Sequence, residues 1–417
     1  MKKWIFKLVF LLAALSLFSQ SPWHHEDPGI QSFYTDVHFS DPHHGWISGI
    51  VGLIMHTSNG GESWEELIAP SVNGTYNIFF INNQEGWACG YSGRMIHTTD
   101  GGQTWEFQTS GSDTFITDVY FINQDTGWTS GGDNGTFPSN IKYREILHTT
   151  DGGNTWTKQV AENYEAPLSC IHFTDENHGY ASGNAGILLR TGDGGNTWSE
   201  VTVNTTYEFN SVFFINPDTG WLVGQDLALP HVAGIYMTTD AGDTWTLQTF
   251  GTDETLSDVH FTDDLHGWAV GGKNDVAVIL HTDDGGNTWN YQDATVDSYL
   301  AAVHFAGDGA GWAVGYETLI TTYDPPPYDK ERPPPSIHLY PNPASDQLII
   351  EPNGLNGDFE SVMIVNSLGQ VVYNSEGAVA AGSSGYSVSV GGLKKGVYHV
   401  IVQENGRRST ETLFISR

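Results

Sequence analysis

Short runs of apolar residues, separated by polar turns, recur at regular intervals along most of the chain. Seven of these runs end at a phenylalanine, and each is followed seven residues later by an aromatic residue that is preceded by glycine. The phenylalanines are Phe39, Phe80, Phe121, Phe173, Phe214, Phe261 and Phe305. Apolar runs of this length between turn residues predict β-strands, and a repeat of about 40 to 50 residues predicts an array of strand units.

A second repeated string, T-x-(D/N)-x-G-x-(S/T)-W, occurs six times and ends each time at a tryptophan. Its acidic or amide side chain can accept hydrogen bonds from the N–H groups of a tight turn, and its glycine permits a positive φ. The residues expected in this structural role are Asn59, Asp100, Asp151, Asp193, Asp240 and Asp284. The tryptophan that closes each string predicts an aromatic plug between neighbouring sheets.

The seventh unit is incomplete, because Pro325-Pro326-Pro327 interrupts its second string. Sixteen residues separate the closing tryptophan of the first unit from the phenylalanine of the second, and the same count back from Phe39 reaches Trp23. The N-terminal segment at Trp23 is therefore expected to supply the missing strand. We predict an all-β protein in which residues 21–324 form a seven-bladed β-propeller, a ring of four-stranded sheets without exposed edges.

The tryptophan-containing strings carry a resemblance to known propellers. The T-x-D-x-G-x-T-W string resembles the Asp-box, also called the bacterial neuraminidase repeat, and the blades are most similar to photosystem II assembly and stability factor propellers. This resemblance implies the propeller fold. The partner binding of that family depends on basic residues across one face, whereas residues 21–324 hold only three Lys and three Arg. The resemblance therefore predicts the fold of this chain better than it predicts a binding partner.

Sialidases also carry the Asp-box, and that family binds its substrate carboxylate with three converging arginines. Arg94 and Arg144 precede their repeat threonines by four and five residues, whereas Arg190 directly precedes its threonine and is expected toward the opposite face. The three arginines are therefore not expected to converge, and a sialidase is not expected.

Loop length varies on one side of the predicted propeller. The step from the Gly-Trp aromatic to the repeat threonine is 11, 11, 21, 11, 17, 14 and 10 residues, whereas the links between first and second strands are uniform. Because binding residues concentrate in variable loops, we expect a ligand on the face of the second-to-third-strand loops and of the loops that lead into each unit. The candidate ligand-binding residues are Tyr34, Tyr76, Arg94, Phe115, Lys142, Arg144, Tyr164, Tyr207 and Tyr299.

Aromatic rings and scattered acids on that face suit a carbohydrate or protein ligand, so a binding module is the favoured interpretation. The alternative is a glycan-cleaving enzyme that pairs Asp133 with Asp226 or Glu208, and a third possibility is a passive adhesion element. No catalytic residue or cofactor is assigned. Eight histidines repeat by blade, immediately before the repeat threonine or the strand phenylalanine, which favours packing over a metal site.

Residues 1–20 differ from the rest of the chain. They combine lysines with an apolar stretch from Ile5 to Phe18, too short to span a bilayer, and predict a secretory signal peptide. No transmembrane segment is expected in the mature chain. The full sequence has 16 Lys and Arg against 49 Asp and Glu and a formal net charge of -33, which argues against nucleic-acid binding through phosphates.

The C-terminal region has a different pattern. Residues 325–336 are rich in proline and predict an extended linker, and residues 337–417 alternate as short strands that predict a small antiparallel β-sandwich. The strings Tyr340-Pro-Asn-Pro343 and Leu393-Lys-Lys-Gly-Val-Tyr398 closely resemble the type A C-terminal sorting domain of type IX secretion. This resemblance implies that the type IX secretion machinery binds residues 337–417 and that the propeller is secreted or placed at the cell surface.

Overall fold

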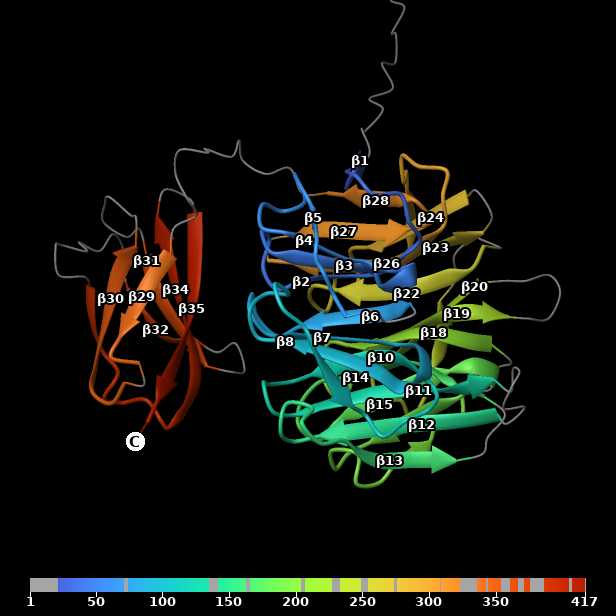
Figure 1. The fold of residues 1–417 in the computed structure, drawn as a ribbon, viewed down its shortest axis with the longest axis horizontal. Coiled ribbons are helices and arrows are strands. Elements are labelled where there is room, and N and C mark those ends of the chain that lie inside the picture. Colours follow the sequence, from blue (N-terminus) through green and yellow to red (C-terminus); the bar gives the residue numbers. More distant parts are fainter. Residues whose placement is uncertain are drawn as a thin grey trace, which may run out of the picture. The chain divides into compact units, whose positions relative to one another are not determined.

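The structure is a computed structural model and describes residues 22–70, 74–134, 142–162, 166–203, 207–226, 233–248, 254–273, 276–307, 309–322, 336–342, 344–353, 361–366, 371–375, 386–404 and 407–416. The chain divides into two compact units, Met1–Pro325 and Pro326–Arg417. Figure 1 labels their strands in chain order.

The first unit holds seven four-stranded antiparallel sheets, numbered here as sheets 1 to 7. Their first strands are β2 (Tyr34–Phe39), β6 (Thr75–Phe80), β10 (Phe115–Phe121), β14 (Leu168–Phe173), β18 (Tyr207–Phe214), β22 (Leu256–Phe261) and β26 (Leu300–Ala306). Each first strand contacts the first strands of both neighbouring sheets, and β26 contacts β2, so the sheets form a closed ring around these strands.

The remaining strands follow outward in order. The second strands are β3 (Gly45–Gly49), β7 (Gly86–Gly90), β11 (Gly127–Asn134), β15 (Gly179–Gly183), β19 (Gly220–Asp226), β23 (Gly267–Lys273) and β27 (Ala310–Gly315). The third strands are β4 (Ile54–Thr57), β8 (Arg94–Thr98), β12 (Lys142–Thr149), β16 (Leu188–Thr191), β20 (Ala233–Thr238), β24 (Val276–Thr282) and β28 (Thr318–Thr321). The outer strands of sheets 1 to 6 are β5 (Glu65–Glu66), β9 (Glu106–Thr109), β13 (Thr157–Glu162), β17 (Ser199–Glu200), β21 (Thr246–Gln248) and β25 (Asn290–Gln292).

Sheet 7 takes its outer strand from the N-terminal side of the chain. Strand β1 (His24–Glu26) pairs with β28 and lies beside it in Figure 1, with His24 opposite Thr321. Trp23, which immediately precedes β1, is 1% exposed and packs edge-on against Phe305 with ring centroids 5.8 Å apart. The two ends of the ring are therefore joined within one sheet.

The repeated Phe and Gly-Trp residues form one joint between each pair of sheets. Phe80 stacks face to face on Trp46 of sheet 1, with centroids 3.5 Å apart, and meets the edge of Trp105 in its own sheet. The same stack recurs between each of the six remaining pairs of neighbouring sheets, with ring centroids 3.5–3.8 Å apart. In sheet 4, Tyr180 takes the place of the tryptophan. Glycine is required before the stacked ring because a Cβ at Gly86 would lie 2.5 Å from the Phe80 ring.

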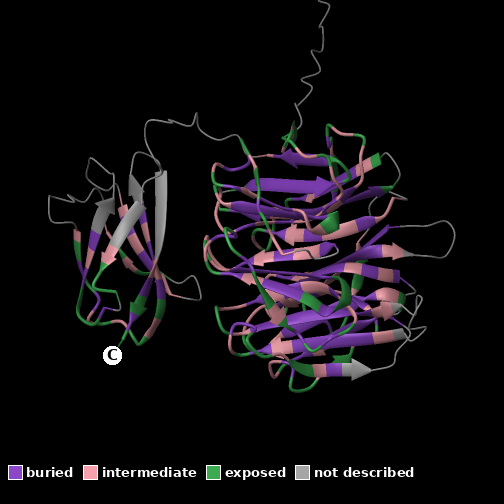
Figure 2. Cartoon of the chain, viewed as in Figure 1, coloured by how far each residue is buried: buried purple, intermediate pink, exposed green. Residues whose placement is uncertain are grey.

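These joints account for most of the large side chains that are fully buried, and buried residues follow the strands of the propeller in Figure 2. Burying an indole removes roughly 150–250 Å² from water, so a shell of such joints stabilises the ring without a disulfide. Cys89 and Cys170 are both free thiols. The predicted all-β propeller is therefore confirmed.

The described part of the chain contains only short helical turns, η1 (Ile50–Gly52), η2 (Tyr91–Gly93) and η3 (Asn184–Gly186), and none could serve as an apolar membrane-crossing helix. The second unit has two antiparallel sheets around its own apolar core. One contains β29 (Ser336–Tyr340), β30 (Gln347–Asn353) and β33 (Tyr386–Ser389). The other contains β31 (Ser361–Asn366), β32 (Val371–Asn374), β34 (Gly396–Glu404) and β35 (Arg407–Ile415).

Candidate functional site

The connections of the propeller form two groups. In sheets 1 to 6 the turn with the repeated T-x-D-x-G string, here called the box turn, donates a backbone N–H to the turn between the first and second strands, at 2.8–3.0 Å. These two kinds of turn make up the turn face. The second-to-third-strand connections and the segments that enter each first strand lie at the opposite ends of the strands and make up the loop face.

Polar groups of the turn face bind one another. In sheet 2 the Asp100 carboxylate accepts hydrogen bonds from Thr98 Oγ1 at 2.8 Å, from the Thr104 N–H at 2.8 Å and from Thr104 Oγ1 at 2.6 Å. The same three bonds recur at Asp151, Asp193, Asp240 and Asp284. Asn59 keeps the first two and donates to the Ser63 hydroxyl instead. These residues hold the turns in shape.

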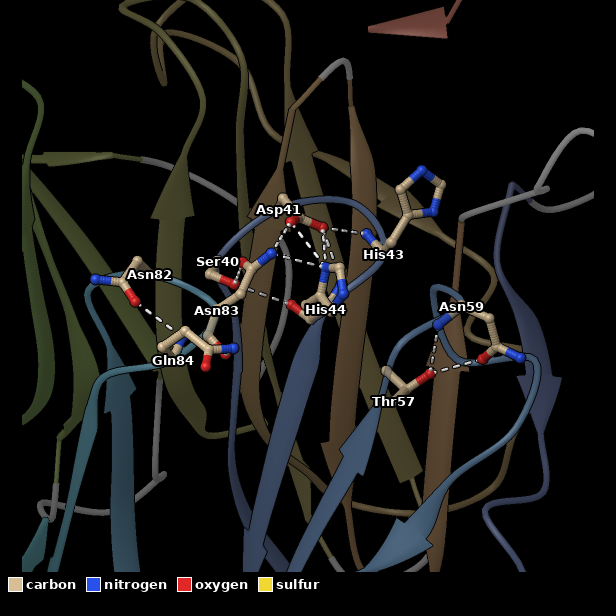
Figure 3. A network of polar contacts seen from close by, with 9 residues as sticks. All are labelled: Ser40, Asp41, His43, His44, Thr57, Asn59, Asn82, Asn83 and Gln84. Atoms are coloured by element: carbon tan, nitrogen blue, oxygen red, sulfur yellow. Dashed lines mark hydrogen bonds and ion pairs between the residues drawn. The ribbon is translucent and has the colours of Figure 1, made fainter. Parts of the chain in front are cut away.

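The turn between β2 and β3 shows the same internal pairing in Figure 3. The Asp41 carboxylate accepts hydrogen bonds from the N–H groups of His43 and His44 at 2.7 and 2.9 Å, and from Asn83 of sheet 2 at 2.9 Å. Burial opposes ionisation, but these bonds and the His44 ring outweigh it and lower the pKa of Asp41 to about 2. The Asp41 carboxylate therefore stabilises the turn through hydrogen bonds within the fold.

Seven aromatic side chains close the centre of the ring of sheets. They immediately precede the strand phenylalanines, and here they are called the central ring: His38, Phe79, Tyr120, His172, Phe213, His260 and His304. Each contacts the next, with centroids 4.5–5.2 Å apart and planes tilted by 42–55°, and His304 returns to His38. Burial lowers the pKa of His172 to about 4 and that of His260 to about 3, so the imidazoles are neutral packing groups.

Three carboxyl groups lie two residues before central-ring members, at a β-bulge that recurs in every first strand. Asp36 accepts the N–H of Ile78 in the next sheet at 3.0 Å, and Asp118 and Asp258 accept the corresponding N–H groups at 2.7 and 2.9 Å. Burial raises the pKa of Asp118 to about 7. Within the described residues, no group of three His, Cys, Asp or Glu side chains is placed to hold a metal ion.

On the loop face, two predicted residues meet a third that the sequence analysis missed. The Tyr76 ring lies 4.8 Å from that of Tyr91, and Phe115 packs edge-on against both, at 6.3 and 5.1 Å. Burial and the hydrogen bond with Tyr91 raise the pKa of Tyr76. These three residues, here called the tyrosine cluster, join sheets 2 and 3.

Arg94 lies beside the tyrosine cluster. It begins β8, directly after η2, and lines a groove of about 460 Å³ with Phe107 of β9 and the segment Thr109–Asp113. The groove brings together a guanidinium, an exposed aromatic ring and backbone groups at the start of sheet 3. Three of the candidate ligand-binding residues, Tyr76, Arg94 and Phe115, therefore fall in one region.

A second group of rings joins sheets 7 and 1. Phe33 stacks on Tyr299 at 6.2 Å and contacts Tyr316 at 6.3 Å, and the Tyr299 hydroxyl accepts a hydrogen bond from Ser257 at 2.7 Å. Tyr316 and Tyr91 each follow the last glycine of a second strand, in the strings G-W-A-V-G-Y and G-W-A-C-G-Y. That shared position was the sequence signal that could have identified both.

Other candidates lie inside the fold. Tyr34 is 1% exposed and donates its hydroxyl proton to the Ile30 carbonyl, and Tyr207 is 8% exposed and packs edge-on against Tyr236. Arg144 is 6% exposed, with Nη1 3.7 Å from Glu200 Oε2. Burial leaves these three side chains little surface for a ligand. Tyr164 and the side chain of Lys142 lie outside the described residues.

The candidate acid pair is spread over non-adjacent sheets. Asp133 lies on β11 of sheet 3, whereas Glu208 lies on β18 of sheet 5, where it accepts a hydrogen bond from Gln225 at 3.5 Å. The side chain of Asp226 lies outside the described residues.

Comparison with known proteins identifies the C-terminal unit first. Residues 338–416 match the family described as "Secretion system C-terminal sorting domain". A sorting domain of this kind supports secretion or cell-surface placement of the propeller and a partner in the secretion machinery.

Among solved structures, the chain is similar to one described as "YCF48 bound to D1 peptide", with a TM-score of 0.58, 22% identity, and coverage of 73% of this chain and 97% of that one. It is also similar to the GH74 xyloglucanase of Xanthomonas campestris, with a TM-score of 0.57, 11% identity, and coverage of 93% and 68%. At these identities the likeness shows the propeller fold alone.

Curated relatives match over short segments. The photosystem II assembly lipoprotein Ycf48 of Synechococcus sp. (strain RCC307) is 43% identical over 53 residues, which cover 13% of this chain and 16% of that protein. The chloroplastic photosystem II stability/assembly factor HCF136 of Oryza sativa subsp. japonica is 46% identical over 46 residues, 11% of each protein. The family described as "Photosynthesis system II assembly factor YCF48" matches residues 15–109, 157–250 and 240–325, more than half of the sequence, and the chain belongs to that family.

Proposed function

We propose that the propeller is an extracellular binding module that recognises a carbohydrate or protein ligand on its loop face. The observation that carries the proposal is the meeting of the tyrosine cluster with the Arg94 groove, on the face where loop length varies. Aromatic rings beside a groove that is lined by Arg94 and Asp113 offer apolar contact and charged groups together. On the turn face, by contrast, the described carboxylates such as Asp41 and Asp100 accept hydrogen bonds from groups of the fold itself.

A binding screen tests this proposal. The full chain is screened against glycan and peptide arrays, and affinities of the hits are compared for Tyr76→Ala, Tyr91→Ala and Arg94→Gln. Tyr291→Ala is the matched control, because Tyr291 is an exposed aromatic residue on the outer strand β25, away from the loop face. We expect at least about a tenfold loss of affinity at the three site variants and none at the control. Equal affinities for all four variants would contradict the proposal.

The glycan-cleaving alternative rests on Asp133 with Asp226 or Glu208, and the GH74 likeness adds only the fold to it. Hydrolysis by paired acids requires carboxyl groups about 5 to 10 Å apart. Turnover of a polysaccharide that is abolished by Asp133→Asn or Glu208→Gln would replace the binding proposal with an enzymatic one.

For the C-terminal unit we propose that residues 337–417 bind the type IX secretion machinery. Deletion of these residues is expected to retain the propeller inside the cell envelope, as measured by immunoblotting of cell fractions. Export of the truncated chain at the normal level would rule out this role.

A further inference from the structure

The short second-to-third-strand turns of sheets 1, 2 and 4 form the same 3-10 turn but carry different side chains, and sheet 7 has a shorter turn at this place. Those of sheets 1, 2, 4 and 7 each place a residue other than glycine at positive φ: Val51 at 64°, Ser92 at 56°, Ala185 at 57° and Glu317 at 51°. The residue just before is apolar or aromatic in three of them, namely Ile50, Tyr91 and Tyr316, and is Asn184 in sheet 4. Here Ile50, Val51, Tyr91 and Tyr316 are called the apolar tips.

Sheet 4 shows that this turn does not require apolar residues. Its sequence, Asn184-Ala185-Gly186, forms the same 3-10 turn as Ile50-Val51-Gly52 in sheet 1. The left-handed region suits asparagine and glycine and disfavours β-branched side chains most strongly. Val51 is nevertheless placed there while 85% exposed, so packing does not compensate for the strain. A strained apolar residue in full contact with water indicates a binding role rather than a folding role.

The apolar tips lie on three neighbouring sheets that are linked to one another. Sheets 7, 1 and 2 are consecutive in the ring, and Phe33 links the first two, since its ring contacts Tyr316 and its carbonyl accepts the N–H of Ile50 at 3.0 Å. The turn η1 then contacts β6, which carries Tyr76, the partner of Tyr91. Ile50, Tyr91 and Tyr316 are 47%, 38% and 53% exposed.

The chemistry of this surface favours a polypeptide over a sugar. Ile50 and Val51 offer no hydrogen-bond donor or acceptor from their side chains, so they cannot satisfy the hydroxyl groups of a carbohydrate, whereas they can bury aliphatic side chains. An acidic group lies at the tips: Glu317 directly follows Tyr316, and its N–H donates to the Ser32 carbonyl at 2.8 Å, next to Phe33. Residues 21–324 carry 40 Asp and Glu against six Lys and Arg. A partner with positive charge is therefore attracted, and an acidic one is repelled.

We propose that the apolar tips of sheets 7, 1 and 2 dock an extended polypeptide segment that carries apolar side chains together with Lys or Arg. This inference rests on the proposed binding function of the loop face and names its ligand class. The apolar side chains cover the tips, and the cations pair with Glu317 and with the acidic surface of the propeller.

The test uses the full chain and three short synthetic peptides in fluorescence anisotropy. The first alternates Leu or Phe with Lys, the second replaces each Lys by Glu, and the third replaces each Leu and Phe by Ser. The chain is compared with the double variant Ile50→Asn, Val51→Ala, which transplants the turn of sheet 4 into sheet 1. The reverse change in sheet 4, Asn184→Ile with Ala185→Val, is the matched control. Melting temperature is measured for every variant.

We expect the first peptide alone to bind, with an affinity that falls as salt is raised. The sheet 1 double variant should bind about tenfold more weakly while its melting temperature stays the same or rises, because strain is removed. The control should bind normally. Binding of none of the peptides, or binding that the sheet 1 variant leaves unchanged, would overturn the inference. If a glycan then bound in a Tyr76-dependent manner, the proposed binding module would stand without this ligand class.

Discussion

The turn face and the loop face lie at opposite ends of the same strands but differ in their side chains. On the turn face Asp41, Asp100 and their counterparts accept several hydrogen bonds each, and the same arrangement recurs from sheet to sheet. On the loop face the turns of sheets 1, 2 and 4 share one 3-10 backbone shape, while their first side chain changes from Asn184 to Ile50 and Tyr91. Saturated, repeated polar groups are typical of a scaffold, and exposed, unrepeated apolar groups support the proposed binding site.

The comparison predicts where substitutions affect stability and where they affect binding. Changes in the joints, the central ring and the turn face should alter the melting temperature, since their side chains contact only the fold. Changes at the tyrosine cluster and apolar tips should alter ligand affinity instead.

Removal of residues 21–30 is expected to have the largest effect. Sheet 7 would lose β1, and Phe305 would lose the edge contact of Trp23, a ring that is only 1% exposed. Loss of a buried indole alone costs about 3–5 kcal/mol, and the unpaired edge of β28 adds to it. Calorimetry should show a melting temperature lowered by more than about 5 °C. An unchanged melt would mean that the ring does not depend on this strand.

Replacement of His172 by Phe is expected to stabilise the protein in acid. The folded pKa of His172, about 4, lies below the unfolded value of about 6.5, so the unfolded state binds more protons between these values and stability falls as pH falls. Phe removes this penalty, which reaches on the order of 3 kcal/mol near pH 4 and vanishes above about pH 7. Phe213 already fills this position in sheet 5, so the ring fits.

A substitution of Asp118 is the control, because it should change the pH dependence of stability in the opposite direction. The folded pKa of Asp118, about 7, lies above the ordinary carboxyl value, so the folded state binds the extra proton and gains stability as pH falls from about 7 toward 4. Asp118→Asn keeps an acceptor for the Ile171 N–H, as Asn77 does for Val119, but loses that gain. Urea unfolding at several pH values should show differences of opposite sign for the two variants. Differences that do not depend on pH would refute the assignment of these groups.

Much of the fold could be predicted from the sequence because the joints repeat. The strand Phe, the Gly-Trp aromatic and the box tryptophan recur at regular spacings along the chain. Each strand Phe stacks on the Gly-Trp aromatic of the preceding sheet, so the repeat in the sequence predicts a contact that recurs between sheets. The central ring was visible only as histidines before Phe39 and its counterparts. Its closure depends on side chains from seven sheets, which no single repeat reveals.

The candidate site was predicted less well because it does not repeat. Tyr34 occupies the buried first position of its strand, which Thr75 fills in sheet 2, whereas Tyr76 is one position further on and points to the other side. Tyr34 and Tyr207 are accordingly only 1% and 8% exposed. Tyr91 and Tyr316 were not predicted because they lie in short turns, whereas the prediction used the variable length of the second-to-third-strand loops. Length variation predicted a binding face that includes the tyrosine cluster, but the burial of each ring depends on packing between neighbouring sheets.

The smallest effect on stability is expected at a single box turn, and it separates hydrogen bonding from charge. Asp100→Ala removes the acceptor of three hydrogen bonds and should cost about 1–2 kcal/mol, seen as a modest fall in melting temperature with unchanged ligand affinity. Asp100→Asn should cost less, because Asn59 performs this role in sheet 1 with its amide oxygen. If the two variants were equally destabilised, the charge of the carboxylate would matter more than its geometry. Weakened peptide or glycan binding by either variant would place the ligand on the turn face and reverse the comparison.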